Sequence, residues 1–152
     1  MTIDWCFKQR NGIKIITIND NLADEYIRTA EETLDVLKSI KGKSKVWLAT
    51  TKYYCKYFAV YALLMKIGIK CEIHECTIEL TKYLAEKDII PLEFYESLKK
   101  DKKLRIDNQY YLKNREVDVD YNSLLIYVLR IKDIINTISI EKINNLRSEI
   151  KL

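Results

Sequence analysis

One stretch constrains the fold of this chain more than any other: WLATTKYYCKYFAVYALLMKI, from Trp47 to Ile67. It contains no Pro or Gly, and its only charged side chains are three lysines. At 3.6 residues per turn its apolar and aromatic residues cover two adjacent faces, so most of the circumference is apolar. Such a helix is typical of the centre of a bundle, and its lysines and tyrosines disfavour a membrane span. The stretch therefore predicts a buried central helix.

Amphipathic segments on both sides of this stretch predict the helices that surround it. With three Gly and one Pro in 152 residues, the chain has little room for long loops. Asn19 to Asn21 can cap the helix before the central one, and Ser44 can cap the central helix. Gly68 can end the central helix, and Asp120 can cap a later one. The predicted helices cover residues 19–41, 47–67, 75–87, 91–103 and 121–139, followed by a helix or a tail at 140–152. We expect a single all-α domain over residues 1–152, an antiparallel bundle of four to five helices.

The N-terminal segment predicts a β-hairpin over residues 4–18. Asn11-Gly12 is the preferred pair for a two-residue type I′ turn, and the IKIITI that follows is rich in β-branched residues. Pairing about this turn places Phe7 opposite Ile16. Because an isolated hairpin is marginally stable in water, we expect it to pack on the helices or on a second subunit.

The cysteines and the single histidine predict no metal site. The N-terminus lacks the apolar run of a secretion signal, which indicates a cytoplasmic protein whose cysteines are mostly reduced. Cys71 and Cys76 flank His74 in CEIHEC, but the spacing does not match paired zinc knuckles. We expect His74 to be a cap or surface residue, and we expect neither a metal nor another cofactor.

The positive charge of the chain is concentrated in one segment, Lys99 to Arg115. Its seven basic residues oppose only Asp101 and Asp107, a local charge of +5, whereas the whole chain carries +4. Tyr110 and Tyr111 lie within it. Such a segment suits a partner that contains phosphate, through charge neutralisation and base stacking. The alternative is a solvated helix end whose lysines serve solubility.

Three segments together resemble the small stand-alone prokaryotic members of the HEPN superfamily. They are the amphipathic helix before the central one, the tyrosine-rich YYCKYFAVYALLMKIGIKCEIHECTI, and RIDNQYY near residue 105. The opening WCFKQRNGIKIITINDNLADEYI is also similar to the start of archaeal members. The resemblance covers roughly residues 1–140. It implies a bundle of four or five helices, commonly a homodimer, that binds or acts on nucleotides or RNA, often beside a small nucleotidyltransferase.

The chain departs from the family where its members cleave RNA. Those members carry Arg, then four to six residues, then His. Here Arg105 is followed at that spacing by Tyr110, with Tyr111 adjacent. Arg105 keeps the ability to grip phosphate bidentately, but a tyrosine with a reference pKa near 10 is a poor proton acceptor at neutral pH. His74 could supply the missing imidazole from another helix or across a dimer.

Three functions follow from these residues. The first is a dimeric, HEPN-like module that binds RNA or a nucleotide, with Arg105 holding phosphate and Tyr110 and Tyr111 hydrogen-bonding or stacking. Its remaining phosphate-binding candidates are Lys99, Lys100, Lys102 and Lys103. The second is a metal-independent ribonuclease, the toxin of a toxin–antitoxin pair, with Arg105, Tyr110 and His74 as catalytic candidates. The third is an interaction partner of a nucleotidyltransferase, in which Arg105 is structural and pairs with Asp101 or Asp107.

Overall fold

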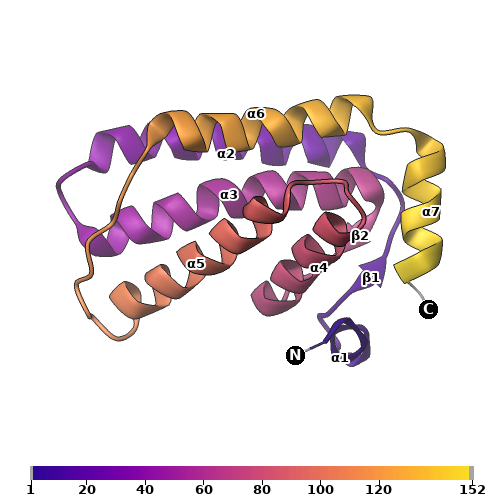
Figure 1. Ribbon diagram of the computed structural model, residues 1–152, viewed down its shortest axis with the longest axis horizontal. Coiled ribbons are helices and arrows are strands. Elements are labelled where there is room, and N and C mark those ends of the chain that lie inside the picture. The colour runs from indigo at the N-terminus through magenta and orange to yellow at the C-terminus, as the bar shows by residue number, and fades with distance from the viewer. Residues whose placement is uncertain (1, 151–152) are drawn as a thin grey trace.

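The computed structural model describes residues 2–150, and within them the chain is mostly helical with one small sheet (Figure 1). The elements in order are α1 (Ile3–Lys8), β1 (Lys14–Ile15), α2 (Asp20–Ile40), α3 (Lys45–Ile67), β2 (Ile69–Lys70), α4 (His74–Glu86), α5 (Leu92–Gln109), α6 (Tyr121–Thr137) and α7 (Ile140–Ile150). The all-α class is confirmed, although the seven helices exceed the predicted four to five.

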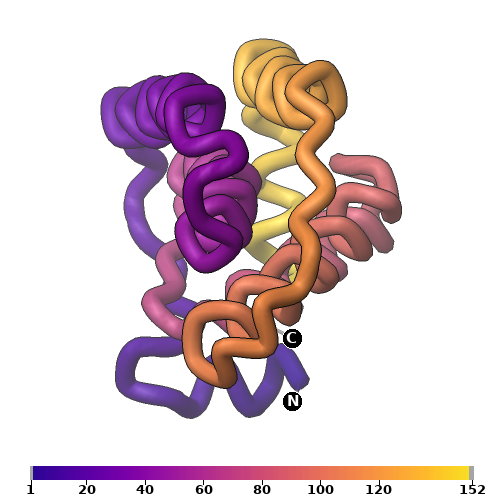
Figure 2. Tube along the Cα trace, turned by 90° about the vertical axis from the view of Figure 1, so that its left-hand side faces the viewer, coloured from indigo at the N-terminus to yellow at the C-terminus, as the bar shows by residue number. Residues whose placement is uncertain are grey.

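The predicted central helix is α3, which contacts α2, α5 and α6. Figure 2 shows α2 and α6 side by side along one edge of the molecule, with α3 beneath them. Most of α3 is buried, including its tyrosines Tyr53, Tyr57 and Tyr61. Helix α4 packs against α5 on the other side of the bundle. Within residues 2–150, no helix is both long and apolar enough to span a membrane.

The predicted helix caps form. The side chain of Asn19 accepts a hydrogen bond from the Leu22 amide at the start of α2, and that of Ser44 caps α3. Asp120 accepts one from the Ser123 amide at the start of α6. Gly68 ends α3 with φ of +83°, in the left-handed region that glycine adopts without a steric penalty. These local signals lie in the sequence, which is why the helix positions were predictable.

The predicted N-terminal hairpin is wrong in its position. Residues 3–8 form α1, and the segment that follows contributes only the two-residue strand β1. This strand pairs antiparallel with β2, with Lys14 opposite Lys70 and Ile15 opposite Ile69. Gly12 does lie in a tight turn, where a Cβ would overlap the carbonyl oxygen of Cys6. A small antiparallel pairing is therefore present, but its second strand comes from a distant part of the chain.

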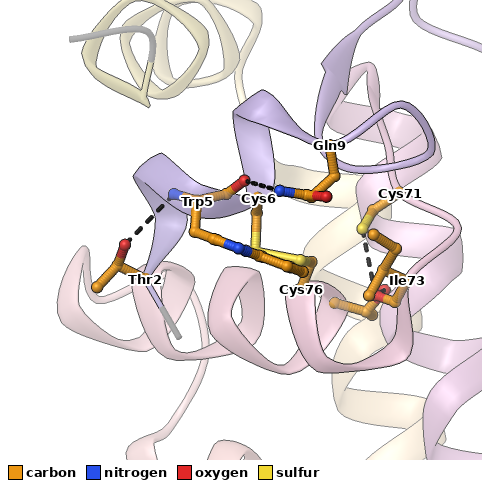
Figure 3. The surroundings of a disulfide bond; sticks show 8 residues. Thr2, Trp5, Cys6, Gln9, Cys71, Ile73 and Cys76 are labelled. Atoms are coloured by element: carbon orange, nitrogen blue, oxygen red, sulfur yellow. Dashed lines mark hydrogen bonds between the residues drawn. A yellow bond between two sulfur atoms is a disulfide. The ribbon is translucent and has the colours of Figure 1, made fainter.

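A disulfide joins Cys6 of α1 to Cys76 of α4, as Figure 3 shows. The prediction that the cysteines are mostly reduced is wrong for this pair, while Cys55 and Cys71 are free and buried. The two bonded residues are 70 positions apart in sequence. Only the packing of α1 on α4 brings them together, and no spacing rule anticipates that packing.

The segment around residues 104–120 continues α5 to Gln109 and then crosses the surface without regular structure. Its anchor is Asn108, which is fully buried. The Asn108 side chain donates to the carbonyl oxygens of Lys45 and Arg115 and accepts from the Arg115 amide.

At the C-terminal end, residues 140–150 form a helix where a helix or a tail was expected. Arg147 of α7 docks it by donating to the carbonyls of Ile16, Ile67 and Gly68.

Candidate functional site

Polar and aromatic side chains from three helices meet where α3, α4 and α5 pack together. They are Tyr53 and Tyr54 of α3, His74 at the start of α4, and Lys102 and Arg105 of α5, which we call the Arg105 cluster. Lys102 and Arg105 are three residues apart and therefore share one face of α5. The cluster therefore brings together His74, Lys102 and Arg105, three candidates that the sequence analysis had named.

Arg105 is held by aromatic side chains. Its exposed fraction is 8%. The guanidinium carbon lies 4.8 Å from the centroid of the Tyr53 ring and 5.5 Å from that of Tyr54. One terminal nitrogen donates to the Tyr54 hydroxyl over 3.1 Å. The Nε atom is buried and has no hydrogen-bond partner among the described residues. The arginine is thus positioned by ring faces that leave part of its donor capacity unused.

The carboxylates expected to neutralise Arg105 are engaged elsewhere. Asp101 lies 2.6 Å from Lys56 and 3.5 Å from Lys52, both of α3. Asp107 lies 2.9 Å from the Arg115 Nε and 3.5 Å from the Lys113 ammonium group. Within residues 2–150, Arg105 forms no ion pair. This geometry is contrary to the hypothesis that Arg105 is a structural residue paired with Asp101 or Asp107.

His74 lies in the same aromatic environment as Arg105. Its Nδ1 is 2.8 Å from the Tyr53 hydroxyl, and its ring stacks on Tyr57 with centroids 4.4 Å apart. Tyr53 and Tyr54 each contact both His74 and Arg105. Burial first, and then the positive charges of Arg105 and Lys102, lower the pKa of His74 to about 4. The imidazole is therefore neutral at pH 7. His74 was expected to be a cap or surface residue, but the N-cap of α4 is Ile73, and His74 is the first residue of the helix and only partly exposed.

Lys102 completes the cluster. It is as buried as Arg105 and forms an ion pair with Glu75, the second residue of α4. Burial lowers the pKa of Lys102, and the neighbouring charge of Arg105 lowers it further. Glu75 is half exposed, so this ion pair lies at the edge of the cluster that faces solvent. Two cations and one carboxylate therefore surround a neutral imidazole.

The other predicted binding residues lie away from this cluster. Lys99 lies over the ring of Tyr95, at 5.9 Å from its centroid. Lys100 and Lys103 line a surface pocket of about 400 Å³ that also contains Arg115 and the acidic residues Asp101, Asp107, Glu116 and Asp118. Its lining is mixed in charge. The structure does not gather the predicted lysines into one basic surface.

Tyr110 and Tyr111 follow the end of α5 and are exposed by 63% and 67%. The ring of Tyr111 lies near Lys113. Among the described residues, the hydroxyl that binds Arg105 belongs to Tyr54, and neither Tyr110 nor Tyr111 contacts Arg105. The Arg105 and Tyr110 spacing that resembles the family motif therefore does not bring the two side chains together.

The residues that sequence reasoning missed are Tyr53, Tyr54 and Glu75. Both tyrosines were expected to lie in the core of the central helix. Tyr53 is fully buried there. It also contacts Arg105 and His74, which the sequence did not indicate. No pattern in the sequence showed that α5 would cross α3 at this point. Among residues 2–150, no group of three or more His, Cys, Asp or Glu side chains is arranged to hold a metal ion.

Known proteins do not assign this site. We compared the chain with models of protein families, with curated proteins and with solved structures, and it matched none of them.

Proposed function

We propose that this chain is a HEPN-like helical module that binds a nucleotide or RNA by holding phosphate at Arg105. The observation that carries the proposal is a buried guanidinium without a carboxylate partner. A buried charge is costly unless it is paired and hydrogen-bonded. Arg105 has one hydrogen bond, to Tyr54, and an Nε atom without a partner in the described part of the chain. An anion from outside the chain would supply the missing compensation.

The donors present in this environment suit phosphate. A guanidinium binds two phosphate oxygens through parallel N–H groups. The Lys102 ammonium group adds a second positive charge, and the Tyr54 hydroxyl can reorient to bond an oxygen. Of the positive segment identified in the sequence, Arg105 and Lys102 lie in this cluster.

A second function, metal-independent ribonuclease activity, is supported by the position of His74. The imidazole shares both tyrosine neighbours with Arg105, so a phosphate at Arg105 would lie close to a proton acceptor. If Nδ1–H donates to the Tyr53 oxygen, Nε2 is free to accept the proton of a 2′-hydroxyl. His74 is therefore a better candidate for proton transfer than Tyr110. Its low pKa makes it a weak base, which would limit the rate.

The experiment that tests the main proposal is RNA binding in EDTA, followed by fluorescence anisotropy. We expect affinity to fall as salt rises. We expect Arg105→Gln to weaken binding about tenfold or more, because a charge-assisted bidentate contact contributes 1.5–3 kcal/mol, roughly. Arg130→Gln is the matched control, since Arg130 is an exposed arginine on α6. Equal affinities for both variants and the wild type would contradict the proposal.

The ribonuclease is tested in the same samples by following the RNA on a denaturing gel. Cleavage in EDTA that leaves a cyclic phosphate, and that is lost in His74→Ala, would establish the activity. Tyr110→Phe should then cleave normally. Retention of RNA without cleavage would leave the binding module as the function.

A further inference from the structure

We infer that the ligand of the Arg105 cluster is a terminal phosphate monoester, the end of a nucleotide or of an RNA strand, held between Arg105 and the N-terminus of α4. This inference rests on the proposed function and specifies which phosphate the site takes. Three observations support it: the burial of Arg105, the uncapped start of α4, and the charge balance of the cluster.

The burial of Arg105 disfavours a phosphate that is flanked on both sides by nucleosides. Only 8% of Arg105 is exposed, and Tyr53 beside it is fully buried. An internal phosphodiester would have to bring two sugars toward these rings to reach the guanidinium. A terminal phosphate projects beyond its sugar and can enter alone. Tyr54 and His74 are the two members of the cluster that are only partly buried, so a ligand would approach beside them.

The start of α4 offers hydrogen-bond donors next to Arg105. The N-cap residue of α4 is Ile73, which makes no side-chain hydrogen bond to the helix. The first backbone bond at this end runs from the Thr77 amide to the Ile73 carbonyl. The preceding amides, from His74 to Cys76, are those that a helix leaves without an internal acceptor. Such amides, with the helix dipole, bind anions readily.

Arg105 is the independent observation that directs an anion to this helix end. Its Nε atom is buried and unpartnered within the described residues, and both tyrosines that hold the guanidinium also contact His74, the first residue of α4. The arginine and the uncapped helix start thus border the same aromatic pair. One phosphate placed between them would satisfy both.

The charge of the cluster matches a terminal phosphate better than an internal diester. Arg105 contributes one positive charge, the Lys102 and Glu75 pair cancels, and the helix N-terminus adds about half a charge. A terminal phosphate carries about −1.5 to −2 at pH 7, whereas an internal diester carries one negative charge. Because Glu75 is half exposed, it can turn to solvent and free Lys102 for the ligand.

The test compares oligoribonucleotides of one sequence that differ only in their ends. One carries a 5′-phosphate, one a 3′-phosphate and one hydroxyls at both ends, each with the label at the opposite end or internally. Binding is followed by anisotropy in EDTA. We expect at least one phosphorylated oligonucleotide to bind about tenfold or more tightly than the hydroxyl form, with inorganic phosphate competing. The difference should vanish in Arg105→Gln and persist in Arg130→Gln.

The outcomes separate this inference from the proposed function. Equal binding of all three oligonucleotides that is lost in Arg105→Gln would overturn the terminal-phosphate inference and leave phosphate binding at Arg105 intact. Absence of any binding that depends on Arg105 would overturn both. AMP, tested as a competitor against adenosine, distinguishes the two sources. Competition by AMP as strong as that by the oligonucleotide indicates a nucleotide ligand, and weaker competition indicates an RNA end. Thermal unfolding of each variant verifies that it is folded.

Discussion

Two buried cations on the packed helices α3 and α5 are in opposite electrostatic situations. Lys56 of α3 and Arg105 of α5 are each 8% exposed. Lys56 lies 2.6 Å from Asp101 and donates to the Ser97 hydroxyl over 2.7 Å. Arg105 has two aromatic ring faces, one tyrosine hydroxyl and no carboxylate within residues 2–150.

The contrast between a paired and an unpaired buried charge indicates where function is expected in a bundle that otherwise has an apolar core. A compensated buried charge, such as that of Lys56, is paired within the chain and holds α3 against α5. A buried charge without compensation lowers stability unless something outside the chain balances it. Such a loss of stability is common at binding sites, because function there outweighs the stability of the free protein. The comparison therefore assigns Lys56 to the fold and is consistent with the proposal that Arg105 binds a ligand.

The largest expected effect is on the Lys56 side of the comparison. Asp101→Ala removes the carboxylate that Lys56 and Lys52 share and leaves Lys56 buried without compensation. We expect a loss of about 3–5 kcal/mol in the free energy of unfolding, measured by urea denaturation. Glu96→Ala, at an exposed position of the same helix, is the control and should change it little.

Arg105→Met, measured in the same way in phosphate-free buffer, should cost much less than Asp101→Ala or should stabilise the protein. It replaces a buried, unpaired charge by an apolar side chain of similar length. If Arg105→Met destabilised the chain as much as Asp101→Ala, Arg105 would be a structural residue and the contrast between the two cations would disappear.

The disulfide gives the next largest effect. It ties α1 to α4, whose first turn carries His74, and it closes a long loop. Such a crosslink typically contributes about 2–4 kcal/mol, and the chain-entropy description gives the upper end of this range for a loop of this length. The double substitution Cys6→Ser and Cys76→Ser should lower the free energy of unfolding by this amount. A reducing agent should do the same to the wild type and leave the double variant unchanged. An unaffected wild type would indicate that the two thiols are not crosslinked.

Phosphate itself should stabilise the protein through Arg105. A ligand that binds only the folded state at a hundred times its dissociation constant contributes about 2.7 kcal/mol. The melting temperature of the wild type should therefore rise with added inorganic phosphate or AMP, compared with chloride at equal ionic strength. Arg105→Met should show no such rise, whereas Arg130→Met should behave like the wild type. A rise of equal size in Arg105→Met would place the phosphate elsewhere.

The protonation of His74 provides a direct probe of Arg105. As the single histidine of the chain, His74 gives one imidazole titration by NMR, with an expected pKa of about 4. We expect Arg105→Met to raise this pKa because a neighbouring positive charge is removed. Bound phosphate should also raise it, because an anion stabilises the imidazolium. A titration that does not respond to either change would show that the two side chains are not coupled.

The lowered pKa of His74 also determines how the free energy of unfolding changes with pH. The pKa of His74 is lower in the folded chain than its ordinary value of 6.5, so the unfolded chain binds more protons between about pH 4 and 6.5. The contribution of His74 to stability is fully present above pH 6.5 and is lost as pH falls toward 4. His74→Gln should flatten this part of the profile relative to the wild type.

The smallest expected effect concerns the hydroxyl that binds Arg105. Tyr54→Phe removes one hydrogen bond and leaves the ring in place, so we expect a loss of about 0.5–1.5 kcal/mol in unfolding free energy. Binding of a phosphorylated oligonucleotide should weaken severalfold, since Arg105 loses its positioning partner. Tyr95→Phe, which alters a tyrosine outside the Arg105 cluster, is the control. Equal effects of the two substitutions would remove Tyr54 from the site.

The sequence by itself determined the positions of the main helices. The apolar circumference of residues 47–67 defined the central helix, and Asn19, Ser44, Gly68 and Asp120 marked helix ends, because capping and periodicity are local properties. The sequence also pointed to Arg105 through its charged segment. It could not give the N-terminal conformation, since Asn11-Gly12 suits a hairpin locally while the segment before it is helical and bonded through Cys6 to α4.

Only the tertiary structure decided which charges meet. Along the chain Lys102, Arg105 and the two aspartates form one basic segment, but in the fold Lys102 pairs with Glu75 and Asp101 pairs with lysines of α3. The field at a site depends on distances and burial across helices, which the linear order of residues does not encode. The meeting of His74 and Arg105, 31 positions apart in the sequence, arises because α4 and α5 pack against each other and Tyr53 and Tyr54 of α3 contact both residues.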